Sequence, residues 1–164
     1  VYWSLTMIFK SLVFASLLTA FATAASADTI QPRDGWVVIK TSKSFDQLVT
    51  DVKTATMAQG MGVVTQAGPT VVAAKRGITI PGNRVIGVFN NDFAVRILAT
   101  STAAMIEAPI RFYVTEDDDG QATLSYKTPN HVFAPYTAEG GPDLSNLANE
   151  LTQVFDKIAQ QASH

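Results

Sequence analysis

A single histidine inside an aromatic, proline-containing segment is the side chain best suited to acid–base or metal chemistry in this sequence. His131 is followed closely by Phe133 and Tyr136. Histidine changes its charge near neutral pH and is a common metal ligand. The other histidine, His164, stands at the C-terminal end, where side chains are seldom held in place. A lone histidine of this kind is more often a surface hydrogen-bonding residue than a functional one, and both interpretations stay open.

One hypothesis is an enzyme whose pocket surrounds this histidine. The pocket would be lined by His131, Tyr136, Tyr126 and Glu107, because aromatic segments carried by a rigid scaffold often form active sites. General acid–base catalysis would need a carboxylate within hydrogen-bond reach of the imidazole. The sequence contains no G-x-S-x-G nucleophile motif and no glycine-rich phosphate loop that opens a helix. The catalytic residues of such an enzyme are therefore unknown from sequence.

A second group of polar side chains lies on the predicted strand Ile110–Thr115. Because strand side chains alternate, Arg111 and Tyr113 share one face, while the apolar residues between them share the other. If the apolar face meets the helices, Arg111 and Tyr113 lie on an open face of the sheet. They could then bind an anionic or aromatic ligand, or a second copy of the domain. The more ordinary role for Arg111 is an ion pair with Glu107 or Glu116.

Metal sites of the usual kinds are not indicated. The sequence has no cysteine, and no second histidine stands at ligand spacing from His131, so a zinc site is not expected. The acidic run 116–119 lacks the spaced ligands of an EF-hand and predicts a hairpin turn. Met57 and Met61 could join His131 at a copper site, since copper(I) favours thioether ligands, although methionines at this spacing more often fill the core. We expect no cofactor and no metal, and copper binding is the third functional hypothesis.

The overall charge argues against nucleic-acid binding. The chain has 12 Lys and Arg residues against 14 Asp and Glu residues, a formal net charge of −2. Non-specific binding to nucleic acid needs several basic side chains directed at phosphates. The sequence shows no such basic cluster.

The N-terminal region predicts a secretory signal peptide. Lys10 precedes an apolar run that ends in Ala25-Ser26-Ala27, the small-x-small pattern that signal peptidase accepts. The apolar run is about 14 residues long, whereas a membrane span needs ~20. Cleavage is predicted between Ala27 and Asp28, with a cut after Ala24 as the alternative. Met7 is the expected translation start.

The predicted processing defines the domain organisation. Residues 1–27 comprise the signal peptide and the residues upstream of it, and residues 28–164 form a single globular domain. A chain of this length can bury a core without disulfide or metal cross-links. We expect a periplasmic or secreted protein with no membrane attachment after cleavage.

The elements that must position these side chains follow from hydrophobic periodicity. Short apolar or alternating runs predict strands, and apolar residues three and four apart predict helices. Strands are predicted at residues 35–40, 61–65, 70–75 (as an edge strand), 85–89, 110–115 and 122–127. Helices are predicted to follow Ser44, Asn90 or Asp92, and Asp143, all of which are suitable N-caps.

The last predicted helix indicates how the elements pack. Its apolar stripe consists of Leu144, Leu147, Leu151, Val154, Phe155 and Ile158. Such a stripe must be buried, and the sheet is the natural partner. The predicted fold class is α+β, a two-layer sandwich with helices packed on one face of a mixed β-sheet. The predicted order is β-α-β-(β)-β-α-β-β-α.

Several local patterns, in this order, resemble the domain of unknown function 302 family of small bacterial α/β domains. They are Phe45, Leu48 and Val52 before Gly60-Met61-Gly62-Val63, then Ile86-Gly87-Val88-Phe89-Asn90, Ala108-Pro109-Ile110, Glu116-Asp117 with Gly120, Leu124-Ser125-Tyr126 and Pro129. The resemblance implies an α/β sandwich that can form a homodimer. It carries over no catalytic residues, because the family has no settled function.

Together these features favour an exported, non-catalytic binding or interaction domain. Its partner would be a small ligand, a protein or a second copy of the chain. The enzyme around His131, Tyr136 and Tyr126 is the alternative.

Overall fold

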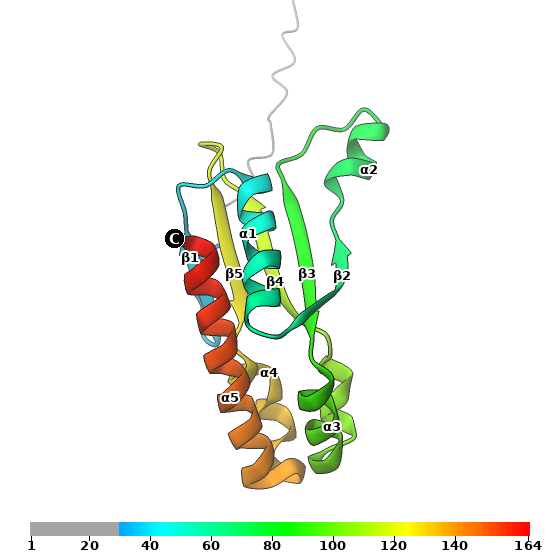
Figure 1. Ribbon diagram of the computed structural model, residues 1–164. Coiled ribbons are helices and arrows are strands. Elements are labelled where there is room, and N and C mark those ends of the chain that lie inside the picture. The colour runs from blue at the N-terminus through cyan, green and yellow to red at the C-terminus, as the bar shows by residue number, and fades with distance from the viewer. Residues whose placement is uncertain (1–29) are drawn as a thin grey trace, which may run out of the picture.

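The computed structural model describes residues 30–164 (Figure 1), so the predicted signal peptide and its cleavage site lie outside the described residues. The strands are β1 (Trp36–Lys40), β2 (Gly62–Ala67), β3 (Asn83–Phe89), β4 (Ile110–Glu116) and β5 (Ala122–Lys127). The helices are α1 (Phe45–Ala58), α2 (Thr70–Lys75), α3 (Asn91–Thr100), α4 (Pro129–Phe133) and α5 (Thr137–Ser163). Two 3-10 helices complete the described chain: η1 (Ala103–Glu107) and η2 (Ala134–Tyr136).

The strands form one five-stranded sheet in the order β1-β5-β4-β3-β2. Every neighbouring pair is antiparallel. The predicted α+β sandwich is confirmed, but the sheet is not mixed as expected. The reason is that α1 carries the chain from one edge of the sheet to the other, so β1 and β2 never become neighbours. The two strands run in the same direction with three strands between them.

Local signals in the sequence set the starts of two helices. The Ser44 side chain accepts a hydrogen bond from the backbone N–H of Gln47 at the start of α1, at 3.4 Å. Asn90 accepts one from the N–H of Phe93 at the start of α3, at 3.2 Å. Each bond satisfies an N–H group that has no partner within the helix. Both predicted N-caps are therefore present.

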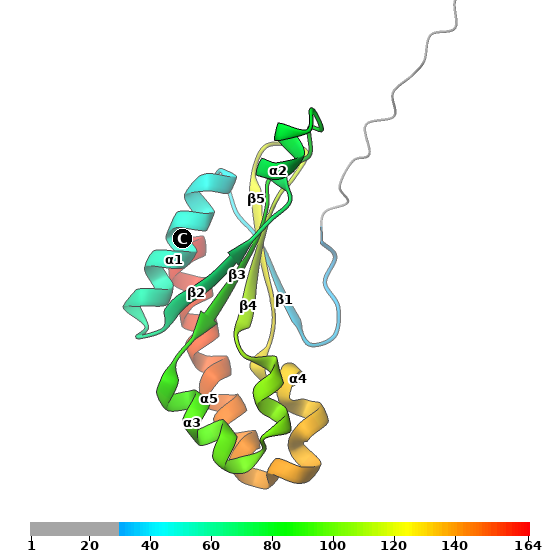
Figure 2. The same cartoon turned by 90° about the vertical axis from the view of Figure 1, so that its right-hand side faces the viewer.

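Residues 68–82, which we call the arm, differ from the prediction. Thr70–Lys75 was expected to be an edge strand but forms the short helix α2, none of whose residues is buried. Local bonds satisfy its backbone, as between the N–H of Ala73 and the carbonyl of Pro69 at 2.9 Å. The arm projects beyond the end of the sheet (Figures 1 and 2), where no strand is available for pairing. A short apolar run is compatible with a strand or a helix, and here the local hydrogen bonds favour the helix.

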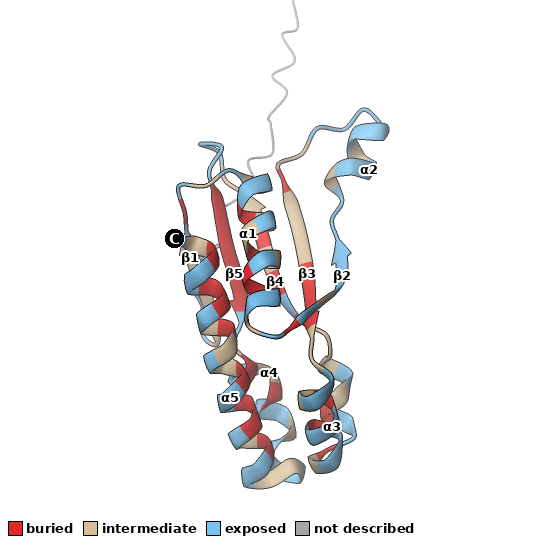
Figure 3. Cartoon of the chain, in the orientation of Figure 1, coloured by how far each residue is buried: buried red, intermediate tan, exposed pale blue. Residues whose placement is uncertain are grey.

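The core lies between the sheet and the helices α1 and α5 (Figure 3). Leu48 of α1 and Phe155 of α5 are fully buried against Phe112 of β4. The rings of Phe112 and Phe155 stack with centroids 4.6 Å apart. Burial of apolar surface and aromatic contacts of this kind supply most of the stabilisation of such a domain.

The long helix α5 extends past the end of the sheet, where α3 and α4 pack against it (Figure 2). Its buried side chains follow the stripe predicted from sequence. The backbone kinks at Gly141, whose φ is 62°, just before Pro142. None of the helices in residues 30–164 is long and apolar enough to cross a bilayer.

Candidate ligand-binding site

The sheet has one covered face and one open face. On β4, Phe112 and Val114 are fully buried. Of the residues that alternate with them, Arg111 is exposed and Tyr113 is half-buried. The alternation predicted for this strand is confirmed. Figure 2 shows α1 and α5 along one side of the sheet, and no helix of the described chain runs along the other side.

A groove of about 470 Å³ lies on the open face, near the end of the sheet that meets η1 and α4. We call it the open-face groove. Its volume falls in the range of small-molecule binding sites, roughly 300–1,000 Å³. Its lining consists of Trp36, Asn83, Val85, Glu107, Ile110, Arg111, Tyr113, Tyr126, Lys127 and Val132.

Two cations lie side by side in this groove. Phe112 of β4 is paired with Tyr126 of β5, so Arg111 and Lys127 are the next residues along the same two strands and share the open face. Both side chains are exposed. Like charges at neighbouring cross-strand positions repel each other. This arrangement favours a negatively charged group between or above the two cations.

The predicted ion pairs of Arg111 are not formed, and that interpretation is wrong. In residues 30–164 the ion pairs are Lys43–Asp51 and Arg96–Glu150. Glu116 instead accepts a hydrogen bond from the backbone N–H of Gly82, at 2.6 Å. Glu107 is bonded to Tyr136. No acidic side chain in the described part of the chain makes an ion pair with Arg111 or Lys127, and Glu107 is the one carboxylate that lines the same groove.

Trp36 forms the β1 side of the groove, and sequence reasoning assigned it only to a strand. It is paired with Lys127 of β5, whose Nζ lies 5.7 Å from the centroid of the indole ring. The guanidinium carbon of Arg33 lies 5.1 Å from the same centroid. The aromatic face thus attracts cations, as the negative face of an indole does. The signal that could have identified Trp36 is a large aromatic residue on the polar face of a predicted strand.

Tyr113 lies on the β3 and β4 side of the groove. Its hydroxyl oxygen accepts a hydrogen bond from the side-chain amide of Asn83 on β3. Val85 is paired with Tyr113 on the same face. The hydrogen bond from Asn83 and the packing against β3 fix the position of the phenol ring. The Tyr113 side of the groove is therefore preformed.

Glu107 reaches the groove from η1 at the helical end of the sheet. The Tyr136 hydroxyl donates a hydrogen bond to Glu107 Oε1, at 2.7 Å. This bond, with smaller effects of burial and of the nearby charges, raises the pKa of Tyr136 above its ordinary value. Tyr136 therefore keeps its proton and holds the carboxylate in place, while Oε2 accepts no hydrogen bond from the described residues.

The structure brings together three of the six side chains that were proposed as a site from sequence, because Glu107, Arg111 and Tyr113 line the open-face groove. Tyr136 lies next to them, through its hydrogen bond to Glu107. Tyr126 is also one of the lining residues. The Tyr126 hydroxyl, however, points to the covered face and donates to Asp156 Oδ1 of α5, at 2.7 Å. Burial, with this hydrogen bond, raises the pKa of Tyr126 well above its ordinary value.

His131 lies apart from this group. Its imidazole packs against the backbone of Gly35, where an added Cβ would come within 2.1 Å of Nδ1. The side chain is exposed and does not line the groove. Among residues 30–164, no carboxylate makes a hydrogen bond to the ring. The geometry that acid–base catalysis by His131 would need is thus not assembled.

The segment around His131 is helical. Residues 129–136 form α4 and η2. Pro129 is at the first turn of α4, and the Thr128 hydroxyl accepts a hydrogen bond from the N–H of His131, at 3.3 Å. Proline is well suited to the first turn and threonine to the N-cap, which explains the helix.

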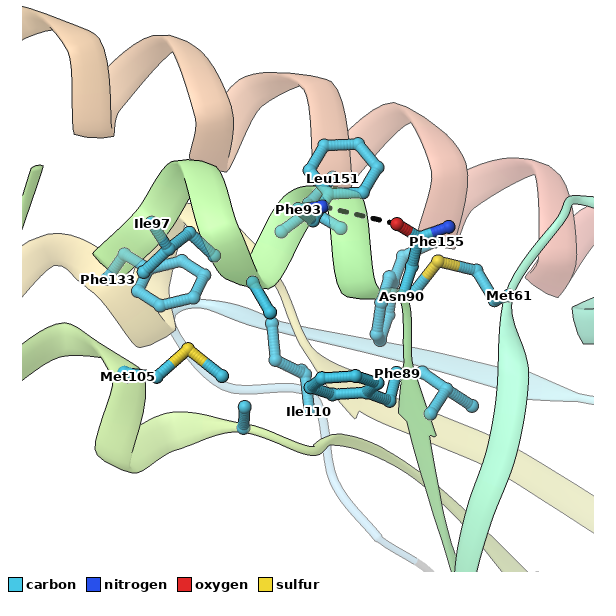
Figure 4. Close-up of a pocket in the computed structure, with 13 residues that line it drawn as sticks. Met61, Phe89, Asn90, Phe93, Ile97, Met105, Ile110, Phe133, Leu151 and Phe155 are labelled. Atoms are coloured by element: carbon cyan, nitrogen blue, oxygen red, sulfur yellow. Dashed lines mark hydrogen bonds between the residues drawn. The ribbon is translucent and has the colours of Figure 1, made fainter. Parts of the chain in front are cut away.

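A second, apolar pocket lies between β3, α3, η1 and α5 (Figure 4). Its volume is about 30 Å³, close to the space of a single water molecule. Met61 and Met105 lie at its two ends in Figure 4. Met57 is 63 % exposed while Met61 is 6 % exposed, so the two methionines of the copper hypothesis face different surroundings. The described residues contain no group of three or more His, Cys, Asp or Glu side chains placed to hold a metal ion.

The fold and the groove define a two-layer α+β domain with a single antiparallel sheet, helices on one face and a polar, aromatic groove on the other. The chain belongs to the family described as "Domain of unknown function DUF302", which matches residues 37–162. The resemblance noted in the sequence is confirmed.

A solved structure supports the same fold. The crystal structure of an uncharacterized conserved protein DUF302 from Bacillus stearothermophilus superimposes with a TM-score of 0.70 at 14 % sequence identity. The match covers 79 % of this chain and 99 % of the other. No curated protein sequence matches the chain significantly.

Proposed function

We propose that this protein is an exported, non-catalytic binding domain whose ligand site is the open-face groove. The observation that carries the proposal is the pair Arg111 and Lys127, which lie side by side in the groove near Trp36 and Tyr113 and make no ion pair among the described residues. Two neighbouring cations raise the free energy of the unliganded groove. An anionic ligand would relieve that repulsion, and the groove has the volume of a small-molecule site.

A parallel thermal-shift screen tests this proposal. The wild-type protein and the double variant Arg111→Gln/Lys127→Gln are screened against one set of metabolites of both charges. A ligand that binds only the folded state raises the melting temperature. We expect anionic compounds to stabilise the wild type and to lose their effect in the double variant. If no compound acts, or if the same compounds act equally on both proteins, the groove is not the site.

The absence of catalysis is tested separately. Wild-type protein and His131→Ala are assayed for esterase, phosphatase and peroxidase activity. We expect no turnover by either protein, because no acid–base pair is assembled at His131. Turnover by the wild type that the substitution abolishes would replace the binding proposal by the enzyme alternative.

Export is the second part of the proposal. It is supported by the sequence pattern that ends in Ala25-Ser26-Ala27. N-terminal sequencing of the protein recovered from the cell envelope or medium is expected to begin at Asp28. Recovery of an uncleaved chain from the cytosol would contradict it.

Self-association is the third part. The neighbouring elements α3 and η1 expose three apolar side chains: Val95 at 58 %, Leu98 at 46 % and Ile106 at 79 %. Apolar surface of this kind favours contact with another protein surface, and a second copy is always available. Light scattering is expected to give a dimer mass for the wild type and a smaller mass for Ile106→Ser. A monomer in both cases would remove this part of the proposal.

A further inference from the structure

The open-face groove presents three kinds of side chain that a single small ligand could contact at once: cations, aromatic rings and one carboxylate. We propose that its ligand is a small aromatic carboxylate with a hydroxyl group at the opposite end of the ring. This inference rests on the proposed binding function and names the chemical class of the ligand.

The cations determine where the carboxylate of the ligand binds. Arg111 presents a planar guanidinium that matches the two oxygens of a carboxylate, and Lys127 adds a second positive charge beside it. The protein as a whole carries a net charge of −2, so this local pair is opposite in sign to the protein average. A carboxylate held by both side chains would neutralise their mutual repulsion.

The aromatic side chains of the groove determine the central part of the ligand, which we expect to be an aromatic ring. Trp36 is directly opposite Lys127 across the β1–β5 pair, and Tyr113 is on the same face of β4 as Arg111, two residues further on. The indole therefore lies across the sheet from Lys127, and the phenol lies along β4 from Arg111. A flat aromatic ring can stack on such walls, which gives it an advantage over an aliphatic body of the same size. A simple inorganic anion would contact the cations but neither ring.

Glu107 determines the orientation. Its carboxylate repels an incoming anion, so the acidic end of the ligand is directed to Arg111 and Lys127 instead. Oε1 already accepts from Tyr136, which leaves Oε2 as an acceptor. A ligand hydroxyl can donate to that oxygen, whereas a bare ring edge would leave a half-buried carboxylate poorly solvated.

Four matched compounds separate these contributions. The test compound is 4-hydroxyphenylacetate. 4-Hydroxyphenylacetamide lacks the charge, cyclohexylacetate lacks both the aromatic ring and the hydroxyl, and phenylacetate lacks only the hydroxyl. Binding is measured by isothermal titration calorimetry. It is also measured by tryptophan fluorescence of the exported protein, because Trp36 is the sole tryptophan of residues 28–164.

Variants locate the contacts. Arg111→Gln and Lys127→Gln should each weaken binding of 4-hydroxyphenylacetate by about tenfold or more, since charge-assisted hydrogen bonds are lost. Arg76→Gln removes the same charge from the exposed arm and is the matched control, with no expected change. Glu107→Gln should reduce the preference for 4-hydroxyphenylacetate over phenylacetate, which a purely structural role of Glu107 would not do.

The expected order of affinity is 4-hydroxyphenylacetate, then phenylacetate, then cyclohexylacetate and the amide, the last two at least about tenfold weaker than the first. Failure of all four compounds to bind overturns the inference. If the metabolite screen still finds a ligand that depends on Arg111 and Lys127, the binding function stands and only the ligand class is wrong. If the amide binds as tightly as the acid, the anionic class is likewise overturned. Equal loss in Arg76→Gln would show that the effect is not local to the groove.

Discussion

On β4, Phe112 and Val114 are fully buried against the helices, whereas their chain neighbours Arg111 and Tyr113 line the open-face groove. On β5 the contrast is confined to the end of the strand at the groove, where Tyr126 is 2 % exposed and Lys127 is exposed, because Thr123 and Ser125 on the open face are fully buried. The covered face carries the apolar burial that stabilises the domain. At the groove, Arg111 and Lys127 are exposed and make no ion pair among the described residues, so they should contribute little to stability. Substitutions on the two faces should accordingly have different consequences.

Phe112→Ala should have the largest effect on stability. Phe112 is fully buried and contacts the rings of both Phe155 and Tyr126. Loss of this side chain leaves a cavity and should lower the free energy of unfolding by about 3–5 kcal/mol. Chemical denaturation measures the change. A loss under about 1 kcal/mol would mean that the covered face does not form the core.

Tyr126→Phe should have the next largest effect. The Tyr126 hydroxyl is buried and donates to the half-buried carboxylate of Asp156. Its removal should cost about 2 kcal/mol, because a hydrogen bond to a charged group is lost. The double variant with Asp156→Asn separates the pair from the general effect of each substitution. Strictly additive losses would show that the two side chains do not interact.

The same tyrosine should make stability depend on alkaline pH. In the unfolded chain a tyrosine deprotonates near its ordinary pKa of 10.0, while burial raises the pKa of Tyr126 in the folded protein. Below pH 10 both states hold the proton and the contribution is complete. Above pH 10 the unfolded state alone loses it, so the free energy of unfolding should fall by up to about 1.4 kcal/mol per pH unit.

Tyr126→Phe serves as the control for this pH dependence. The variant should show a shallower decline above pH 10, measured by denaturation at a series of pH values. Parallel curves for the two proteins would assign the decline to other groups.

Arg111→Gln should have the smallest effect on stability. Arg111 is exposed and makes no ion pair among the described residues, so the free energy of unfolding should change by less than about 0.5 kcal/mol. Relief of its repulsion with Lys127 would make the small change favourable. Ligand binding, by contrast, should weaken strongly. A large loss of stability would indicate that Arg111 has a structural role and would remove the contrast between the two faces.

Patterns that depend on nearby residues were predictable from the sequence. Three such patterns depend on residues only a few positions apart. They are the alternation along β4, the apolar stripe of α5 and the N-caps Ser44 and Asn90. The separation of Arg111 and Tyr113 from Phe112 and Val114 followed directly from such a period. These two polar residues line the open-face groove.

Features that depend on distant pairing were not predictable. The order of the strands places β1 beside β5, and this alone brings Trp36 beside Lys127. Nothing local to Trp36 indicates that neighbour. The absence of an ion pair at Arg111 likewise depends on where Glu107 and Glu116 find other partners. The position of Lys127 beside Arg111 follows instead from the β4–β5 hairpin, whose turn the sequence does predict.

The arm has a consequence for how this chain can be altered. Gly68 at its base approaches the carbonyl of Asn83 so closely that an added Cβ would lie 2.1 Å from the oxygen, and Thr70 donates to the carbonyl of Pro81 at 3.2 Å. The two ends of the arm are thus held close to each other, while no residue of α2 between them is buried. Residues can therefore be inserted or deleted between Thr70 and Pro81 without disturbing the sheet and the helices packed on it. A peptide tag or a reporter domain inserted near Gly77 should leave folding intact.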